Sequence, residues 1–204
     1  LAATSSGLLF YNLTPNEEFH TFIQTDFSGK VIANLLQTEK EIGESTSGQK
    51  TLIKGSDGNI YAVLPEGNEV YVWKDEAFVL AYSMDYGDKS IPENYNRKNQ
   101  SLMEEDYYAI NTNVFVLPEL FVNSFLYGEK RYYVFTSFKQ DKQISGIVRD
   151  KKTDLPFFPQ WQAGNCLIGW CNGIDVNKFL SQKESASSIS EDSDVLLLFY
   201  PKPL

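Results

Sequence analysis

The chain has 204 residues, which is enough for one large or two small domains with a substantial core. Hydrophobic residues make up 42% and charged residues 22%, a balance typical of folded soluble domains, and the aromatic share of 14% favours β-strands. The formal net charge of -9 argues against a nucleic-acid-binding protein, because affinity for phosphate groups comes from Lys and Arg. No apolar run approaches the roughly 18 residues that span a bilayer, so no transmembrane segment is predicted.

The first residues, "LAATSSGLLFYN", lack an initiator Met, a basic start and an apolar stretch long enough for a signal peptide. We therefore expect a processed or truncated chain from which any export signal has been removed. The two cysteines are too few to indicate a redox compartment.

Short strands bounded by turn residues are predicted from the start of the chain. In residues 18–25 apolar side chains fall on both faces, which is typical of a sheet packed between two other sheets. The turn "DFSGK" places Gly29 where a positive φ costs nothing, so residues 26–30 are predicted to form a hairpin tip. The strands predicted in this region are residues 7–13, 18–25 and 30–36.

The same pattern returns in three later segments. Residues 51–87 contain four strand-like runs with short connections, which predict a four-stranded antiparallel meander. A third copy covers residues 120–153, and a fourth begins near residues 164–171 and ends at residues 194–203. Equivalent strands are roughly 45 to 60 residues apart, a spacing that fits β-propeller blades with loop insertions.

We therefore predict an all-β fold, a β-propeller built from four-stranded antiparallel blades, of which about four are visible. The chain is treated as a single propeller domain over residues 1–204, with blades at roughly residues 7–48, 49–88, 114–155 and 160–204. Two polar insertions, residues 88–113 and 175–194, interrupt the pattern. The second insertion opens like a short helix with Asp175 as its N-cap. Loops on a propeller face are where recognition usually occurs.

One predicted hairpin, residues 130–153, has apolar side chains on both faces of both strands. Tyr133 and Phe135 alternate with Tyr132 and Val134 along its first strand. We interpret this hairpin as scaffold that packs between neighbouring blades, with residues 139–142 as its solvent-exposed tip.

Four segments carry a resemblance to a known family. They are "GNIYAVLPEGNEVYVWK", "YSMDYGDKSIP", "RYYVFTSFKQDKQISGIVRDKKT" and the closing "DVLLLFYPKPL". Together they resemble the six-bladed β-propeller lipoproteins, broadly NHL-like, that gut-dwelling bacteria export. In that family a "Y-x-x-D-Y/F-G-…-I-P" segment closes one blade, and the matching residues here are Tyr82, Asp85, Tyr86, Gly87, Ile91 and Pro92. The resemblance implies an exported protein, periplasmic or at the cell surface, with a lipid anchor in the full-length precursor.

The chain is shorter than the resemblance requires, because six blades of about 45 residues exceed 204 residues. Since the last strand resembles a family C-terminus, we expect a C-terminal portion of a larger propeller that lacks N-terminal blades. The alternatives are a small propeller, or an arc closed by a partner subunit, because an open ring leaves sheet edges unpaired.

Candidate catalytic and metal-binding residues find little support. His20 lies mid-strand with no second His or Cys at ligand spacing. The odd separation of Cys166 and Cys171 puts them on opposite faces of a continuous strand, so we expect two buried thiols; a disulfide would require a turn at Gly169. The acidic runs at residues 104–106 and 191–194 favour solvated loops over calcium ligands or an acid/base pair. No catalytic residue, metal or cofactor is predicted.

Aromatic residues provide the candidate ligand contacts. Tyr107 and Tyr108 adjoin the first acidic run, while Trp161 and Trp170 flank the entry to the last blade. Exposed rings stack on the apolar faces of sugars or on peptide side chains; the alternative for Trp161 is packing between blades. These residues favour a binding module that recognises a glycan or peptide through face loops. The alternatives are a carbohydrate-active lyase or hydrolase with scattered carboxylates, and a protein-protein interaction scaffold.

Overall fold

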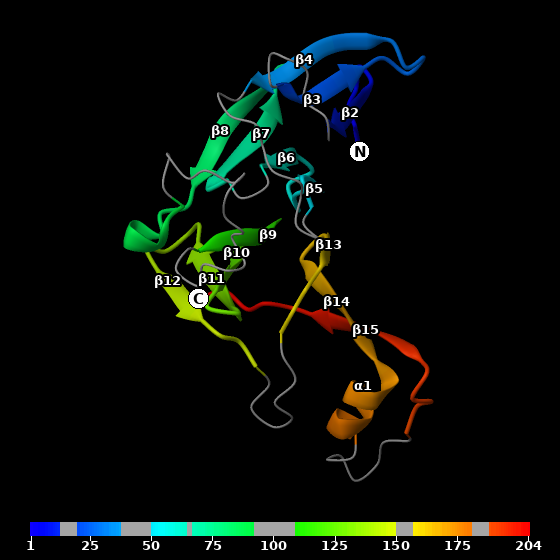
Figure 1. The fold of residues 1–204 in the computed structure, drawn as a ribbon, viewed down its shortest axis with the longest axis vertical. Coiled ribbons are helices and arrows are strands. Elements are labelled where there is room, and N and C mark those ends of the chain that lie inside the picture. Colours follow the sequence, from blue (N-terminus) through cyan, green and yellow to red (C-terminus); the bar gives the residue numbers. More distant parts are fainter. Residues whose placement is uncertain (13–19, 38–49, 65–66, 92–108, 150–156, 181–187) are drawn as a thin grey trace, which may run out of the picture.

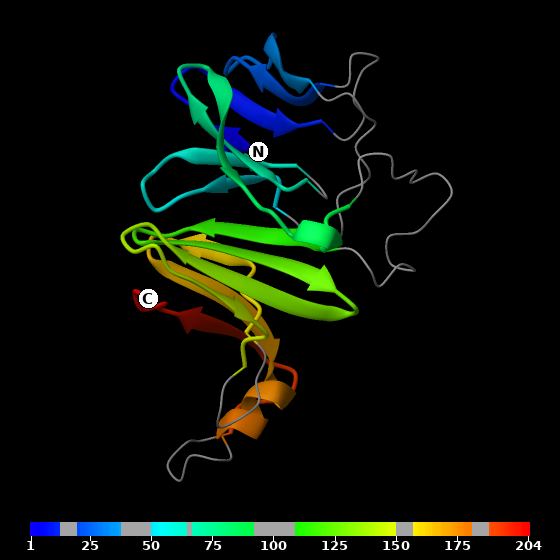
Figure 2. The ribbon, with the colours of Figure 1, turned by 90° about the vertical axis from the view of Figure 1, so that its left-hand side faces the viewer.

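The computed structural model describes residues 1–12, 20–37, 50–64, 67–91, 109–149, 157–180 and 188–204. Within these residues the chain forms four antiparallel sheets that follow one another in chain order. Figure 1 shows the sheets along an arc, and Figure 2 shows them stacked as successive layers. This architecture confirms the predicted all-β propeller fold with about four visible blades.

The first two sheets are meanders in which each strand pairs with the next, in the orders β1-β2-β3-β4 and β5-β6-β7-β8. Their short connections contain the turn residues seen in the sequence. Gly29, between β3 and β4, has a φ of 89°, as the turn prediction requires. The strands are β1 (Ala2–Ala3), β2 (Leu8–Tyr11), β3 (His20–Thr25), β4 (Val31–Gln37), β5 (Leu52–Lys54), β6 (Ile60–Val63), β7 (Glu69–Lys74) and β8 (Ala77–Ser83).

The third sheet has the order β12-β11-β10-β9, and the fourth has three described strands in the order β13-β14-β15. A 3-10 helix, η1 (Gly87–Lys89), follows β8, and an α-helix, α1 (Gly173–Leu180), separates β14 from β15. The strands are β9 (Ile110–Val116), β10 (Leu120–Tyr127), β11 (Lys130–Ser137), β12 (Gln143–Gly146), β13 (Trp161–Ala163), β14 (Cys166–Asn172) and β15 (Asp194–Phe199).

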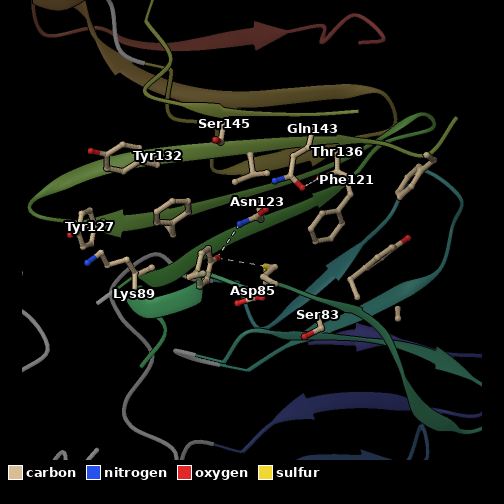
Figure 3. Close-up of a pocket in the computed structure, with 18 residues that line it drawn as sticks. Ser83, Asp85, Lys89, Phe121, Asn123, Tyr127, Tyr132, Thr136, Gln143 and Ser145 are labelled. Atoms are coloured by element: carbon tan, nitrogen blue, oxygen red, sulfur yellow. Dashed lines mark hydrogen bonds between the residues drawn. The ribbon is translucent and has the colours of Figure 1, made fainter. Parts of the chain in front are cut away.

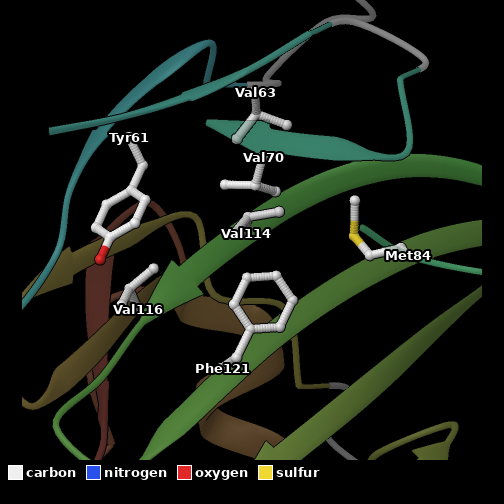
Figure 4. Packing of buried hydrophobic residues seen from close by; sticks show 7 residues of the cluster. All are labelled: Tyr61, Val63, Val70, Met84, Val114, Val116 and Phe121. Atoms are coloured by element: carbon white, nitrogen blue, oxygen red, sulfur yellow. The ribbon is translucent and has the colours of Figure 1, made fainter. Parts of the chain in front are cut away.

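Two hydrophobic clusters join the third sheet to its neighbours on either side. Alternation along β9 explains this, because Val114 and Val116 face one neighbour while Phe115 faces the other. Leu167 of β14, which is fully buried, belongs to the cluster with the fourth sheet. The cluster with the second sheet, shown in Figure 4, consists of Tyr61, Val63, Val70, Met84, Val114, Val116 and Phe121.

Three sheets meet at the backbone of Val116, the last residue of β9. The side-chain amide of Gln162, on β13, donates to the Val116 carbonyl at 2.6 Å and accepts from the Val116 N–H at 3.0 Å. The N–H of Ser56, just after β5, donates to the same carbonyl at 2.9 Å. These bonds satisfy backbone groups at the inner edge of the third sheet, where an innermost strand has no further neighbour in its own sheet.

The predicted helix is present as α1, but the predicted N-cap Asp175 is wrong. The side-chain oxygen of Asn172 accepts from the N–H of Asp175 at 2.9 Å, so Asn172 supplies the cap and Asp175 lies in the first turn. The helix begins earlier because β14 leads into it directly at Gly173. A Cβ at that glycine would lie 2.1 Å from the carbonyl oxygen of Ser190, which explains why the junction needs glycine.

Cys166 and Cys171 are buried free thiols on opposite faces of β14, as expected from their spacing. Burial raises the pKa of Cys171, which keeps that thiol protonated. No helix in the described ranges is long and apolar enough to cross a membrane.

Candidate functional site

An open groove of about 880 Å³ lies between the second and third sheets. Its volume falls within the range of roughly 300 to 1,000 Å³ that is usual for ligand sites. One wall comes from β8 and the residues that follow it, and the other from β10, β11 and β12 (Figure 3). The cluster around Val63 and Phe121 fills the inner part of the same space, so the groove occupies the outer part.

Strand register places the lining side chains of the third sheet on one face. Alternate residues of β10 and β11 point into the groove, because side chains of a strand alternate between faces. Cross-strand pairing then forms three rows of facing side chains. The rows are Phe121–Thr136–Gln143, Asn123–Val134–Ser145 and Phe125–Tyr132.

Aromatic rings make a continuous surface at one end of the groove. Phe125 and Tyr132 stack with ring centroids 5.4 Å apart and planes 12° apart. Tyr86 packs on Phe125 at 4.8 Å, and Tyr127 lies 6.4 Å from Tyr132. Aromatic pairs in this distance range stabilise one another, so the rings form a preorganised surface.

A second aromatic group lies at the other end. Tyr82 packs against Phe121 at 4.5 Å and stacks near Phe138 at 5.9 Å. Phe138 is 44% exposed although it is a large apolar side chain. The groove therefore has an aromatic platform at each end, separated by the row Asn123–Val134–Ser145.

Neutral polar groups line the wall between the platforms and beside them. The amide nitrogen of Asn123 donates to the Tyr86 hydroxyl at 3.0 Å, and the Tyr86 hydroxyl lies 3.8 Å from the sulfur of Met84. Burial raises the pKa of Tyr86, so its hydroxyl stays neutral. The Thr136 hydroxyl donates to the side-chain oxygen of Gln143 at 3.3 Å. These groups offer hydrogen bonds without charge.

Charge in the groove is limited to Asp85 and Lys89 among the lining residues that the structure describes. One carboxylate oxygen of Asp85 accepts from the N–H of Gly87 at 2.7 Å. The Lys89 ammonium lies 5.7 Å from the Tyr127 ring centroid and 3.3 Å from the carboxylate of Asp88. That contact with Asp88 raises the pKa of Lys89, so the lysine is charged.

The predicted ligand residues are not brought together in the described part of the chain. Tyr107, Tyr108 and the acidic run at residues 104–106 lie outside the described residues. Trp161 and Trp170 lie on the fourth sheet, outside the groove, and are 39% and 40% exposed. The indole N–H of Trp170 donates to the carboxylate of Asp194 at 3.0 Å.

The hairpin interpretation holds for one face only. Tyr133 and Phe135 pack towards the fourth sheet, as expected of scaffold. The opposite face, with Tyr132 and Val134, lines the open groove. The tip at residues 139–142 is exposed, as predicted. The alternation in sequence showed two apolar faces, but only the packing of the neighbouring sheet shows which of them is covered.

His20, on β3, belongs to no metal-binding group: in the described ranges, no three or more His, Cys, Asp or Glu residues are grouped to hold an ion. The acidic residues 191–194 are mostly exposed and lie between α1 and β15. The groove therefore presents stacking surfaces and neutral hydrogen-bonding groups as its main chemistry.

Comparison with known proteins agrees with this architecture. A family model described as a 6-bladed beta-propeller matches residues 4–169. A crystal structure from Bacteroides fragilis NCTC 9343, of a protein named "Putative exported protein", is similar with a TM-score of 0.65 and 14% sequence identity. The alignment covers 94% of this chain and 61% of that one, so the chain spans about three fifths of that relative. The likeness at this identity shows the fold. No curated protein sequence matches significantly.

Proposed function

The chain belongs to the 6-bladed β-propeller family, and we propose that it is a binding module that holds an oligosaccharide in the groove between its second and third sheets. The observation that carries this proposal is the composition of the groove. Two aromatic platforms lie at its ends, with neutral amide and hydroxyl groups between them.

The chemistry of a sugar chain fits this arrangement. The C–H faces of pyranose rings pack on aromatic side chains, and sugar hydroxyls exchange hydrogen bonds with amides and hydroxyls. Asn123, Thr136, Gln143 and Ser145 supply such groups along one wall. An open groove of about 880 Å³ that runs along three rows of side chains has room for an extended ligand.

We favour a binding site over a hydrolase active site because the described lining of the groove contains one carboxylate. Most glycoside hydrolases use a pair of carboxyl groups that flank the scissile bond. Asp85 is the one carboxylate among the lining residues that the structure places, and one of its oxygens already accepts a hydrogen bond from Gly87.

The aromatic pair predicted from sequence is proposed as part of the same site. Lys89 and Ala109 both line the groove, and the N–H of Ala109 donates to the Lys89 carbonyl at 2.7 Å. The insertion therefore leaves and rejoins the described chain at the edge of the groove. Tyr108 directly precedes Ala109, which supports a contact of Tyr107 or Tyr108 with the same ligand.

We also propose that the protein acts outside the cytoplasm, in the periplasm or at the cell surface, as a lipid-anchored, NHL-like protein of a gut bacterium. The name of the Bacteroides fragilis relative supports export, and the sequence motifs support the rest. Fractionation of cells that express the full-length protein tests this location. Recovery in the membrane-anchored or periplasmic fraction is expected, and recovery in the cytosol would contradict it.

A glycan array followed by calorimetry tests the binding site. The Tyr132→Ala variant removes a stacking ring worth about 0.5 to 1.5 kcal/mol beyond its area, so affinity is expected to fall at least about two- to tenfold. The Ser145→Trp variant places a bulky ring in the groove from an exposed position and is expected to abolish binding. Phe27→Ala is the matched control, because Phe27 is a 68% exposed aromatic residue outside the groove lining.

The proposal fails if no glycan binds, or if a bound glycan is unaffected by both groove variants. A peptide library is tested in parallel. Peptide binding that Ser145→Trp abolishes, without any glycan binding, would replace the oligosaccharide with a peptide ligand. Circular dichroism of each variant checks that the fold is intact.

A further inference from the structure

A second and smaller pocket lies where the innermost strands of three sheets meet. Its volume is about 160 Å³, and its lining comes from β5, β9 and β13 with the residues beside them. In Figure 1 these three strands lie near the centre of the arc. We call this the axial pocket. It is separate from the groove, with which it shares no lining residue.

The axial pocket is basic in an acidic protein. The chain has 27 acidic and 18 basic residues, yet Lys50 and Lys54 line this pocket and no Asp or Glu is among the described residues around it. Neither lysine forms an ion pair with a described residue. Two cations with no carboxylate among the described lining residues make a site that attracts an anion.

Trp161 gives the pocket a flat apolar surface beside that charge. The Lys50 ammonium lies 5.7 Å from the centroid of the Trp161 ring, and the ring is 39% exposed. An exposed indole next to a cation can stack on the apolar face of a ligand while the cation contacts a charged substituent of the same ligand.

Asn113 adds a polar residue to the wall of the pocket. Asn113 lines the axial pocket and is 6% exposed, and its side-chain oxygen is buried with no hydrogen-bond partner among the described residues. The wall beside it is fixed, because Gln162 is hydrogen-bonded to both backbone groups of Val116.

We propose that the axial pocket binds a small carboxylate that also carries hydroxyl groups, that is, a sugar acid. The carboxylate contacts Lys50, which lies beside the Trp161 ring, with Lys54 as the second cation of the pocket. The ring of the ligand packs on Trp161, and its hydroxyls face the polar residues of the lining. The ligand is either a free sugar acid or a uronic acid residue of a polysaccharide, since both present the same groups. This site is independent of the proposed oligosaccharide groove.

Isothermal titration calorimetry tests the proposal with D-galacturonate and trigalacturonate as the two sources, and D-galactose as the uncharged comparison. At least one acidic ligand is expected to bind at least tenfold more tightly than galactose, with an affinity that falls as salt is raised. Lys50→Gln is expected to weaken that binding at least tenfold. Lys30→Gln, at an exposed hairpin tip that is not part of the pocket lining, is expected to leave it unchanged.

Three results would overturn the proposal: no binding of either acid, equal binding of acid and galactose, or full affinity in the Lys50→Gln variant. Lys54→Gln serves as the second variant if Lys50→Gln fails to fold. Binding by the monomer indicates a free sugar acid, and binding by the trimer alone indicates a polysaccharide; both support the site. Lys50 and Lys54 do not line the groove. If the axial pocket binds no sugar acid, the proposed oligosaccharide site in the groove is therefore unaffected, and the Tyr132→Ala and Ser145→Trp variants still test it.

Discussion

The Gln162→Glu substitution would disrupt the point where three sheets meet. The wild-type amide accepts from the Val116 N–H and donates to the carbonyls of Val116 and Gly164, at 2.6 and 3.0 Å. A glutamate has nearly the same shape, so packing is preserved. It keeps the acceptor but replaces both donors with a charged oxygen that faces two carbonyl oxygens.

The structure sets the expected size of the effect. The two donated hydrogen bonds, with a net value of about 0.5 to 1.5 kcal/mol each, give about 1 to 3 kcal/mol, and the repulsion between the new carboxylate oxygen and the two carbonyl oxygens adds to this loss. The bond to Gly164 is exposed and contributes least. We therefore expect Gln162→Glu to lower the free energy of unfolding by about 2 to 3 kcal/mol, with Gln162→Ala losing a comparable amount.

Urea denaturation monitored by tryptophan fluorescence measures this change. The control is Gln143→Glu, because Gln143 is exposed and has one described side-chain hydrogen bond, so its loss is expected to stay within about 0.5 kcal/mol. Equal stability of the Gln162→Glu variant and the wild type, with unchanged m-values, would refute the view that this amide holds the inner strands together.

Two further predictions concern the core between the third and fourth sheets. Leu167→Ala is expected to lower the free energy of unfolding by about 2 to 5 kcal/mol, because Leu167 is 0% exposed, whereas Leu198→Ala, at 56% exposure, is expected to cost much less in the same denaturation assay. Burial raises the pKa of Tyr133 to about 12, above its usual value of 10, so its neutral form stabilises the fold below pH 10 and this contribution is lost as the pH rises towards 12. Denaturation between pH 9 and about 12 is expected to show a smaller loss of stability for Tyr133→Phe.

Each of these predictions has a contrary result. If Leu167→Ala and Leu198→Ala lowered the free energy of unfolding equally, the two side chains would be equally buried. That result would contradict the observed difference in exposure. An identical alkaline decline in Tyr133→Phe and wild type would show that the Tyr133 hydroxyl does not contribute to it.

The strands can be predicted from the sequence because the residues within each strand and its flanking turns determine where it begins and ends. Alternation of apolar residues and turn glycines such as Gly29 mark strands and hairpins without reference to distant parts of the chain. The cap of α1 was misplaced because nothing in the local sequence shows that β14 runs directly into the helix. There the contact of Gly173 with Ser190, a residue distant in the chain, decides the start.

The candidate sites depend on contacts between sheets, which a single sequence does not show. Tyr132 and Tyr133 are neighbours with the same side chain, yet one lines the groove and the other is 1% exposed in a core. Trp161 is predicted as a ligand contact from its aromatic character and its position at the entry to the last blade. The two lysines and the asparagine that share its pocket come from the second and third sheets, 48 or more residues away in the chain.

The groove is best tested by NMR titration of the protein with the oligosaccharide selected on the array, following the side-chain amide signals of Asn123 and Gln143. Both amides line the groove, whereas the side-chain amide of Asn59 is bonded to Asp57 in an exposed turn outside it. Binding in the groove predicts saturable shifts of the Asn123 and Gln143 signals with no shift for Asn59. Saturable binding that leaves Asn123 and Gln143 unshifted would contradict the assignment of the groove as the ligand site.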